Sequence, residues 1–194
     1  MSSIGIPAAF PTSVKRRFSL AMLLIAGMMP LQCATLERLS LDDLIAKSTT
    51  IVRGKVTGST AAFSGPVIYT HYTIQVSEQF KGTKQESVDV VVPGGTANGL
   101  RQSFAGAPVL NPGDEFVFFL YTGKSGLTTV TGLTQGLFSL PGDGSADPTA
   151  TRDAARELML DPASGRPVKD QTLNLKLSDL RQRIAAGVKG ASAK

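Results

Sequence analysis

Cysteine and histidine are almost missing from this chain of 194 residues, which has one of each. Because Cys33 is the only cysteine, no disulfide can form within one molecule. Because His71 is the only histidine, cysteine and histidine cannot supply the usual zinc and iron ligand sets. We therefore expect no metal and no other cofactor. We also expect the folded domain to be stabilised by burial of apolar side chains alone.

Long apolar runs are also scarce, since the only one begins at Phe18 and ends before Pro30. It is shorter than the ~20 residues that cross a bilayer, so we expect no transmembrane span. The basic cluster Lys15-Arg16-Arg17 directly precedes it, and this order is typical of a secretory signal peptide. We interpret residues 1–34 as a signal peptide and expect export to the periplasm or the extracellular space.

The expected cleavage site lies next to the only cysteine. Cys33 and Ala34 are the best small residues after the apolar run, so the mature chain is expected to begin near Thr35. Cleavage after Gln32 would instead make Cys33 the first residue, free or carrying a lipid anchor. Gln32 disfavours the lipid anchor, because lipoprotein signals usually carry a small residue immediately before the cysteine.

The net charge of +5 overstates the basic character of the mature chain. Without residues 1–34, 17 basic and 15 acidic residues remain, a net charge of +2. Seven of these basic residues and only two acidic ones lie in the tail, at residues 166–194. The aromatic side chains gather at residues 116–119, which are expected in the core. We therefore expect no nucleic-acid partner.

Short β-branched and apolar runs alternate with turn residues, which indicates a mainly β fold. Ser40 and Asp43 form a capping pattern that predicts a helix over 41–47. Strands are predicted at 50–57, 67–76, 86–92, 115–121, 127–132 and 136–140. The run at 115–121 is apolar on both faces and is expected to be central. A small antiparallel barrel of the OB type is favoured, and an immunoglobulin-like sandwich is the alternative.

The composition changes at Pro141, where glycine, proline and aspartate become frequent. We predict a solvated linker over 141–170 with a short helix at 154–160. A C-terminal helix is predicted from a cap at Ser178, with a frayed end. The expected organisation is a signal peptide at 1–34, an OB-like barrel at 35–140, the linker at 141–170, and the C-terminal helix and tail at 171–194.

Three segments together carry a resemblance to a known family. They are Thr49–Val56, Tyr72–Gly82 with its Phe-Lys-Gly ending, and Val88–Val92. This order resembles the netrin-like OB fold, whose best-known members are the tissue inhibitors of metalloproteinases. In those inhibitors the first residue is a cysteine that chelates the protease zinc and is held in place by disulfides. Here Cys33 has no other cysteine to pair with. The stretch from Val90 to Phe138 also resembles exported bacterial proteins.

Residues that carry chemistry are few. A Ser-His-Asp relay would need His71, whose place between Tyr69 and Thr73 in a strand favours an ordinary surface histidine. Asp143, Asp147 and Asp153 have a loose spacing that indicates a solvated loop instead of a calcium site. We identify no catalytic residue.

The best candidate for binding is the long loop that starts at Gly94 and Gly95 and continues through Arg101 and Gln102. It lacks the Gly-Lys-Ser/Thr ending of a phosphate loop. Long loops on rigid barrels often bind ligands. Our leading hypothesis is an exported, non-enzymatic binding module for a protein or cell-envelope ligand. An inhibitor or accessory factor of a secreted protease is the second hypothesis, and a hydrolase is the third.

Mass spectrometry of the exported chain tests the signal-peptide interpretation. We expect cleavage after Cys33 or Ala34, so that the first residue lies near Thr35 and no lipid mass is added. A secreted product that still contains residues 1–34 would contradict this interpretation. A lipid-modified Cys33 at the first position would identify a lipoprotein instead.

Overall fold

The computed structural model describes residues 35–142 and 144–192. The chain divides into two units, Met1–Gln32 and Cys33–Lys194, and the described residues belong to the second unit. The predicted signal peptide, the possible modification at Cys33 and the side chain of Asp143 lie outside the described residues. The interpretation of residues 1–34 therefore stays a prediction.

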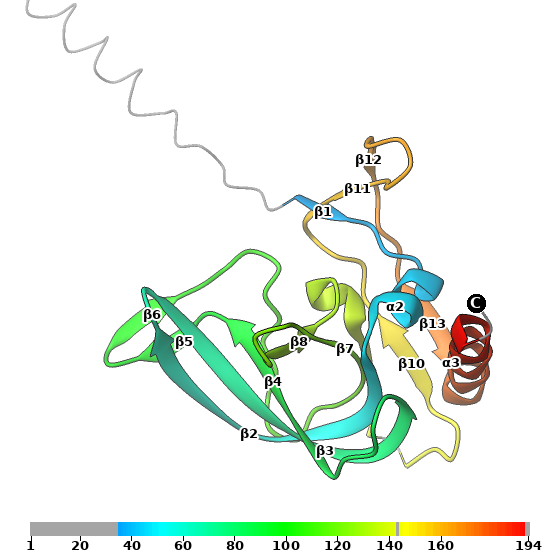
Figure 1. Ribbon diagram of the computed structural model, residues 1–194, viewed down its shortest axis with the longest axis horizontal. Coiled ribbons are helices and arrows are strands. Elements are labelled where there is room, and N and C mark those ends of the chain that lie inside the picture. The colour runs from blue at the N-terminus through cyan, green and yellow to red at the C-terminus, as the bar shows by residue number, and fades with distance from the viewer. Residues whose placement is uncertain (1–34, 143, 193–194) are drawn as a thin grey trace, which may run out of the picture. The chain divides into compact units, whose positions relative to one another are not determined.

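The described chain is mainly β, with two α-helices (Figure 1). The helices are α2 (Leu41–Lys47) and α3 (Leu177–Ser192), and a 3-10 turn, η1, covers Leu133–Gly136. The strands are β1 (Thr35–Glu37), β2 (Thr50–Ser64), β3 (Val67–Lys81), β4 (Ser87–Pro93), β5 (Gly95–Ala97), β6 (Leu100–Gln102), β7 (Glu115–Thr122), β8 (Thr128–Val130), β9 (Leu137–Ser139), β10 (Thr149–Arg152), β11 (Leu158–Leu160), β12 (Pro167–Val168) and β13 (Leu173–Lys176).

The main sheet has the strand order β13-β10-β9-β7-β2-β3-β4, and β8 also pairs with β7. Strands β1, β11 and β12 form a second sheet, while β5 and β6 form a small hairpin. Among the described strands, only the β1–β11 pair is parallel. The prediction of a mainly β, antiparallel fold is confirmed. Within the described residues, no complete ring of hydrogen-bonded strands closes the main sheet into a barrel.

Helix α2 has the bounds that the sequence predicts, and backbone groups at both of its ends form hydrogen bonds with side chains. The Ser40 hydroxyl accepts a hydrogen bond from the Asp43 amide, and the Asp43 carboxylate accepts one from the Ser40 amide. At the other end, the Lys81 ammonium of β3 donates to the carbonyl of Ile45 at 2.6 Å. A cation at a helix C-terminus also interacts favourably with the helix dipole.

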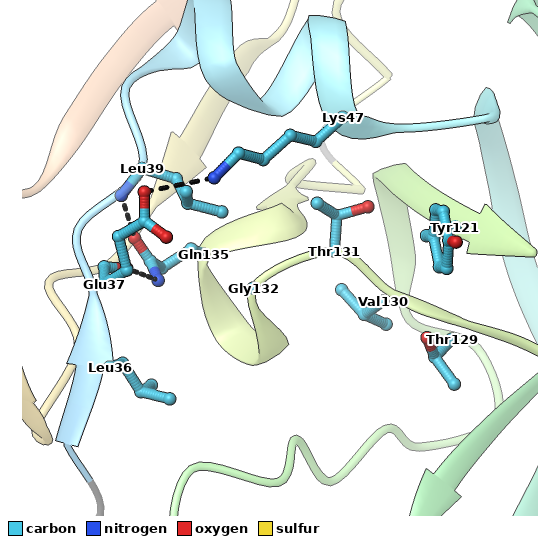
Figure 2. Close-up of a pocket in the computed structure, with 10 residues that line it drawn as sticks. All are labelled: Leu36, Glu37, Leu39, Lys47, Tyr121, Thr129, Val130, Thr131, Gly132 and Gln135. Carbon is cyan, nitrogen blue, oxygen red and sulfur yellow. Dashed lines mark hydrogen bonds and ion pairs between the residues drawn. The ribbon is translucent and has the colours of Figure 1, made fainter. Parts of the chain in front are cut away.

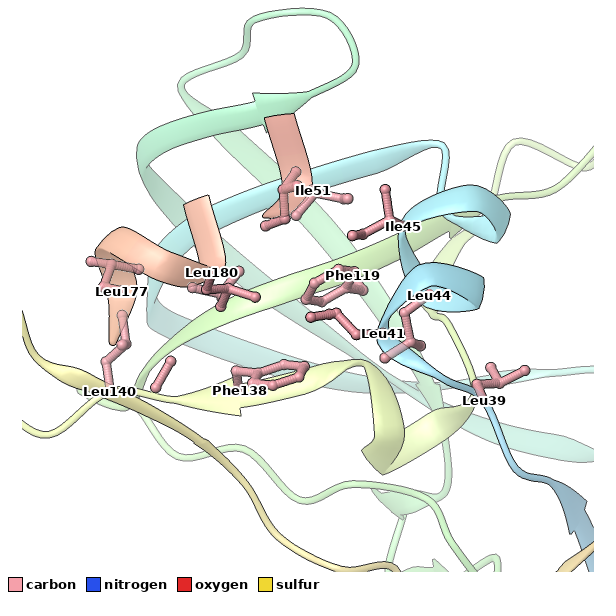
Figure 3. Packing of buried hydrophobic residues seen from close by; sticks show 13 residues of the cluster. Leu39, Leu41, Leu44, Ile45, Ile51, Phe119, Phe138, Leu140, Leu177 and Leu180 are labelled. Carbon is pink, nitrogen blue, oxygen red and sulfur yellow. The ribbon is translucent and has the colours of Figure 1, made fainter. Parts of the chain in front are cut away.

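Strand β7 separates two apolar clusters, because its side chains alternate between its faces. Phe118 and Leu120 pack in the first cluster with residues of β2, β3, β4 and β8. Val117 and Phe119 pack in the second cluster with both helices, β9 and β10 (Figure 3). All four side chains are fully buried. The predicted central position of this strand is confirmed.

Strands β2 and β3 are longer than predicted, at 15 residues each. The sequence signal fades after Thr57, because small and polar residues replace the alternating apolar ones. The β2–β3 hairpin nevertheless continues to the turn at Gly65-Pro66.

The sheet does not end at residues 136–140, and the prediction of a linker with a helix at 154–160 is wrong. That region supplies β10, β11 and β12. Strand β10 pairs with β9 on one side and with β13 on the other. These strands are too short to produce a recognisable alternation, and β11 pairs with β1 at the start of the described residues, far away in the sequence.

Helix α3 begins one residue earlier than predicted, and Ser178 is not its cap. The Asp147 carboxylate accepts hydrogen bonds from both the amide and the hydroxyl of Ser178, each at 2.8 Å. These bonds hold the pKa of Asp147 below its usual value. Leu180 and Ile184 are buried, whereas Ala185 is exposed. Among the described residues, neither helix is long and apolar enough to cross a bilayer.

Replacement of Phe119 by alanine tests the second apolar cluster. Phe119 is fully buried, with its ring centroid 5.4 Å from that of Phe138. We expect Phe119→Ala to lower the free energy of unfolding by about 3–5 kcal/mol in urea titrations. The matched control is Phe104→Ala, since Phe104 is 42% exposed and should contribute far less. Equal losses for both variants would contradict the assigned packing.

Candidate functional site

The candidate functional site is a pocket of about 480 Å³ beside β1 and β8, here named the β1–β8 pocket (Figure 2). Leu36 of β1 lies across the hollow from Val130 of β8. The pocket is lined by Leu36, Glu37, Leu39, Lys47, Tyr121, Thr129, Val130, Thr131, Gly132 and Gln135. These residues come from four separate stretches of sequence.

The pocket combines apolar walls with a polar rim. Leu39 and Val130 are buried in the two apolar clusters, and Tyr121 is 47% exposed. On the rim, the Lys47 ammonium lies 3.1 Å from the Glu37 carboxylate. Both partners are about half exposed, so this ion pair contributes little to stability. Its effect is to place one charge of each sign beside an apolar hollow.

Gln135 holds the β1 side of the pocket in place. Its side-chain carbonyl accepts a hydrogen bond from the Leu39 amide at 2.8 Å, and its side-chain NH₂ donates to the Glu37 carbonyl at 3.0 Å (Figure 2). A single amide side chain thus provides the bonds that a neighbouring strand would make. Gln135 is only 1% exposed, so these bonds are shielded from water.

The turn before Gln135 requires a glycine. Gly132 has a φ of +66°, and a Cβ on it would lie 2.7 Å from the Leu39 Cδ1 atom. Leu133 follows with a φ of +58°, which is unfavourable for a residue with a side chain. This turn therefore brings η1 close to the segment after β1 and directs Gln135 toward it.

A buried ion pair fixes the same segment from another direction. Arg152 of β10 lies 2.7 Å from the Asp170 carboxylate, and both side chains are almost fully buried. Arg152 also donates to the carbonyls of Leu39 and Gln171, and Asp170 accepts from the Ala155 amide. Burial lowers the pKa of Arg152, and the charge of Asp170 opposes this shift. The pair joins the end of the β1 segment to two later parts of the chain.

The predicted loop residues lie together at a different and smaller pocket of about 200 Å³. Gln102 accepts from the Ile68 amide at 2.7 Å and donates to the Pro66 carbonyl at 2.9 Å. Gly94 and Gly95 have φ values of +105° and +134°, and a Cβ on Gly95 would overlap the Thr70 hydroxyl. Arg101 is exposed on β6. Gln102 and the two glycines thus attach this loop to the β2–β3 hairpin.

The predicted long loop that starts at Gly94 also has more order than expected, because it contains β5 and β6. His71 lies on β3, where its Nδ1 atom is 2.7 Å from the Asp89 carboxylate. Both side chains are about half exposed, as expected for a surface pair across two strands. Within residues 35–142 and 144–192, no group of three or more His, Cys, Asp or Glu could hold a metal ion.

The sequence did not reveal the residues that line the β1–β8 pocket. Leu36, Tyr121 and Val130 are ordinary strand residues, and only the fold brings them together. Gln135 had a weak signal, because it lies between two glycines, Gly132 and Gly136. An amide side chain in a glycine-rich turn favours a bond to the backbone, but its target cannot be read from the sequence.

No protein-family model matches this chain, and no curated protein sequence matches it.

Replacement of Gln135 tests the fixation of β1. We expect Gln135→Ala to lower the free energy of unfolding by about 1–3 kcal/mol and to speed hydrogen exchange of the Leu39 amide, because two shielded bonds are lost. The matched control is Gln75→Ala, since Gln75 makes its side-chain bond at an exposed position of β3. Unchanged exchange at Leu39 in Gln135→Ala would contradict this role.

Proposed function

We propose that this chain is an exported, non-enzymatic binding module whose β1–β8 pocket takes an apolar side chain of a protein ligand. The observation that carries the proposal is the form of this pocket. Its apolar walls include Leu36, Leu39 and Val130, and its volume of about 480 Å³ suits one or two side chains. The ion pair of Glu37 and Lys47 supplies polar groups at the rim, where the ligand backbone would lie.

We further propose an OB-like arrangement for β2, β3, β4, β7 and β8. The ladders support the order β4-β3-β2-β7-β8. Strands β4 and β8 also lie close together, so a ring would need only this last junction. Because neighbouring ladders are antiparallel, β4 and β8 run in the same direction. Five antiparallel strands in a nearly closed ring would agree with the OB fold that the sequence resembles.

Export is part of the proposal and rests on the sequence. The basic cluster before the apolar run supports it, as does the lack of a second run of that length. A periplasmic or extracellular location would bring the pocket into contact with secreted proteins and with the cell envelope.

Inhibition of a secreted protease, or assistance to one, is the second candidate function. It is favoured by the position of β1, because the first described strand of the chain borders the pocket and is fixed by Gln135. A rigid segment beside an apolar pocket could occupy the cleft of a protease. This candidate predicts that the chain slows hydrolysis of a fluorogenic peptide by a secreted zinc endopeptidase.

A displayed library of random peptides tests the pocket directly. We expect peptides selected on the exported wild-type chain to share an apolar residue. Thr129→Trp should weaken their binding at least about tenfold, because the indole would fill the pocket. The matched control is Thr73→Trp on the exposed face of β3, which should change binding less than about twofold. Peptides that bind both variants equally would contradict the proposal.

A further inference from the structure

The C-terminal half of β2 carries a second surface that the proposed function does not use. Strand β7 pairs with β2 only from Thr50 to Lys55, whereas β3 pairs with β2 as far as Ser64. The bonds between β2 and the turn at 111–114 end at Val56. In the part of the chain that the structure describes, the ladders give Gly58–Ser64 a neighbour on the β3 side only. We name these seven residues the β2 edge.

The β2 edge is regular. Its register with β3 runs from Gly58 opposite Thr73 to Ser64 opposite Val67 without a shift, although three irregularities precede it. Bulges within an edge strand twist it away from other chains. The β2 edge has none after Gly58, so its backbone can accept another strand.

Charge and proline, which protect most exposed edges, are also missing here. From Val56 to Ser77 the sequence has no Asp, Glu, Lys or Arg, and Gly58–Ser64 contains no proline. Strand β5 packs across a face of the hairpin instead of along its edge. A Cβ on Gly95 would meet side-chain atoms of Ala61, Ile68 and Thr70, which share that face.

Three short strands at the edges of the sheets carry features that hinder pairing with another chain. Strand β13 has four residues and ends in Lys176. Strand β12 has two residues and begins with Pro167. Strand β1 is bonded by Gln135 on the side away from β11. Compared with these three strands, the β2 edge is the better template for pairing.

We propose that the β2 edge pairs with the β2 edge of a second copy of this chain, antiparallel, about a twofold axis near Ala61. Two uncharged edges meet without like-charge repulsion, and a twofold axis lets one surface complement itself. Glycine, serine, threonine and alanine dominate the segment, so the strands can approach closely. Phe63, which is 39% exposed, would lie beside Ser59 of the partner subunit.

Sedimentation equilibrium of the exported chain tests this pairing. We expect a reversible dimer, and we expect Ala62→Lys to raise its dissociation constant at least about tenfold. Ala62 is exposed, and the twofold axis would bring the two new charges close to each other. The matched control is Thr73→Lys, which adds the same charge to the exposed face of β3, one strand away from the edge. Its dissociation constant should stay within about twofold of the wild-type value.

A second measurement uses only the wild-type chain, so it does not depend on the folding of a variant. A synthetic peptide with the sequence of residues 56–66 should dissociate the dimer. Dimerisation should also slow hydrogen exchange within Gly58–Ser64.

Three results would overturn the proposal. The first is a monomer at every concentration up to about 0.5 mM. The second is a dimer that resists both Ala62→Lys and the peptide, because it would use another surface. The third is protection of the β2-edge amides only after an unrelated extended peptide is added, because the edge would then serve a foreign strand.

Discussion

The structure depends on burial of both faces of β7. Val117, Phe118, Phe119 and Leu120 are all fully buried, and they alternate between the two apolar clusters. Both edges of the strand are also bonded, to β2 on one side and to β8 and β9 on the other. Because one strand belongs to both clusters, neither cluster can repack without moving the other. This coupling fixes the two apolar clusters relative to each other in a domain that has no disulfide.

Hydrogen bonds and a buried ion pair help to position the segment that contains β1 and Leu39. Gln135 bonds to Glu37 and Leu39, while the pair of Arg152 and Asp170 reaches the same segment from a later part of the chain. A buried ion pair contributes little net stability, but the loss of one partner is costly. Such contacts select one position for the segment. The wall of the β1–β8 pocket is therefore defined by directional bonds.

Two glutamine side chains, Gln135 and Gln102, make the same pair of hydrogen bonds to the backbone. Gln135 bridges the carbonyl of residue 37 and the amide of residue 39, and Gln102 bridges the carbonyl of residue 66 and the amide of residue 68. In each case one side-chain amide forms hydrogen bonds with a backbone amide and a backbone carbonyl of an extended segment. At that place no described strand continues the ladder. The β2 edge, within the described residues, has no such bond, and this difference is what leaves its backbone open to a second chain.

The sequence by itself determined the local elements. The capping residues Ser40 and Asp43 predicted α2 with its observed bounds, and the β-branched and apolar runs predicted strands at 67–76 and 86–92, where β3 and β4 lie. Those features depend on neighbours within a few residues, so they can be read from the chain directly. The run at 115–121 even revealed a strand that is buried on both faces.

Only the tertiary structure decided where the pocket lies and how the C-terminal third folds. Strands β10 and β11 exist because they pair with partners far away in the sequence, and Asp147 caps α3 from 31 residues away. Gln102 was a reasonable candidate for binding, yet its amide is bonded to the backbone of residues 66 and 68. Gln135 meets its targets more than 95 residues away. Such contacts form only in the folded chain. The residues around a position in the sequence do not indicate which distant residue it will contact.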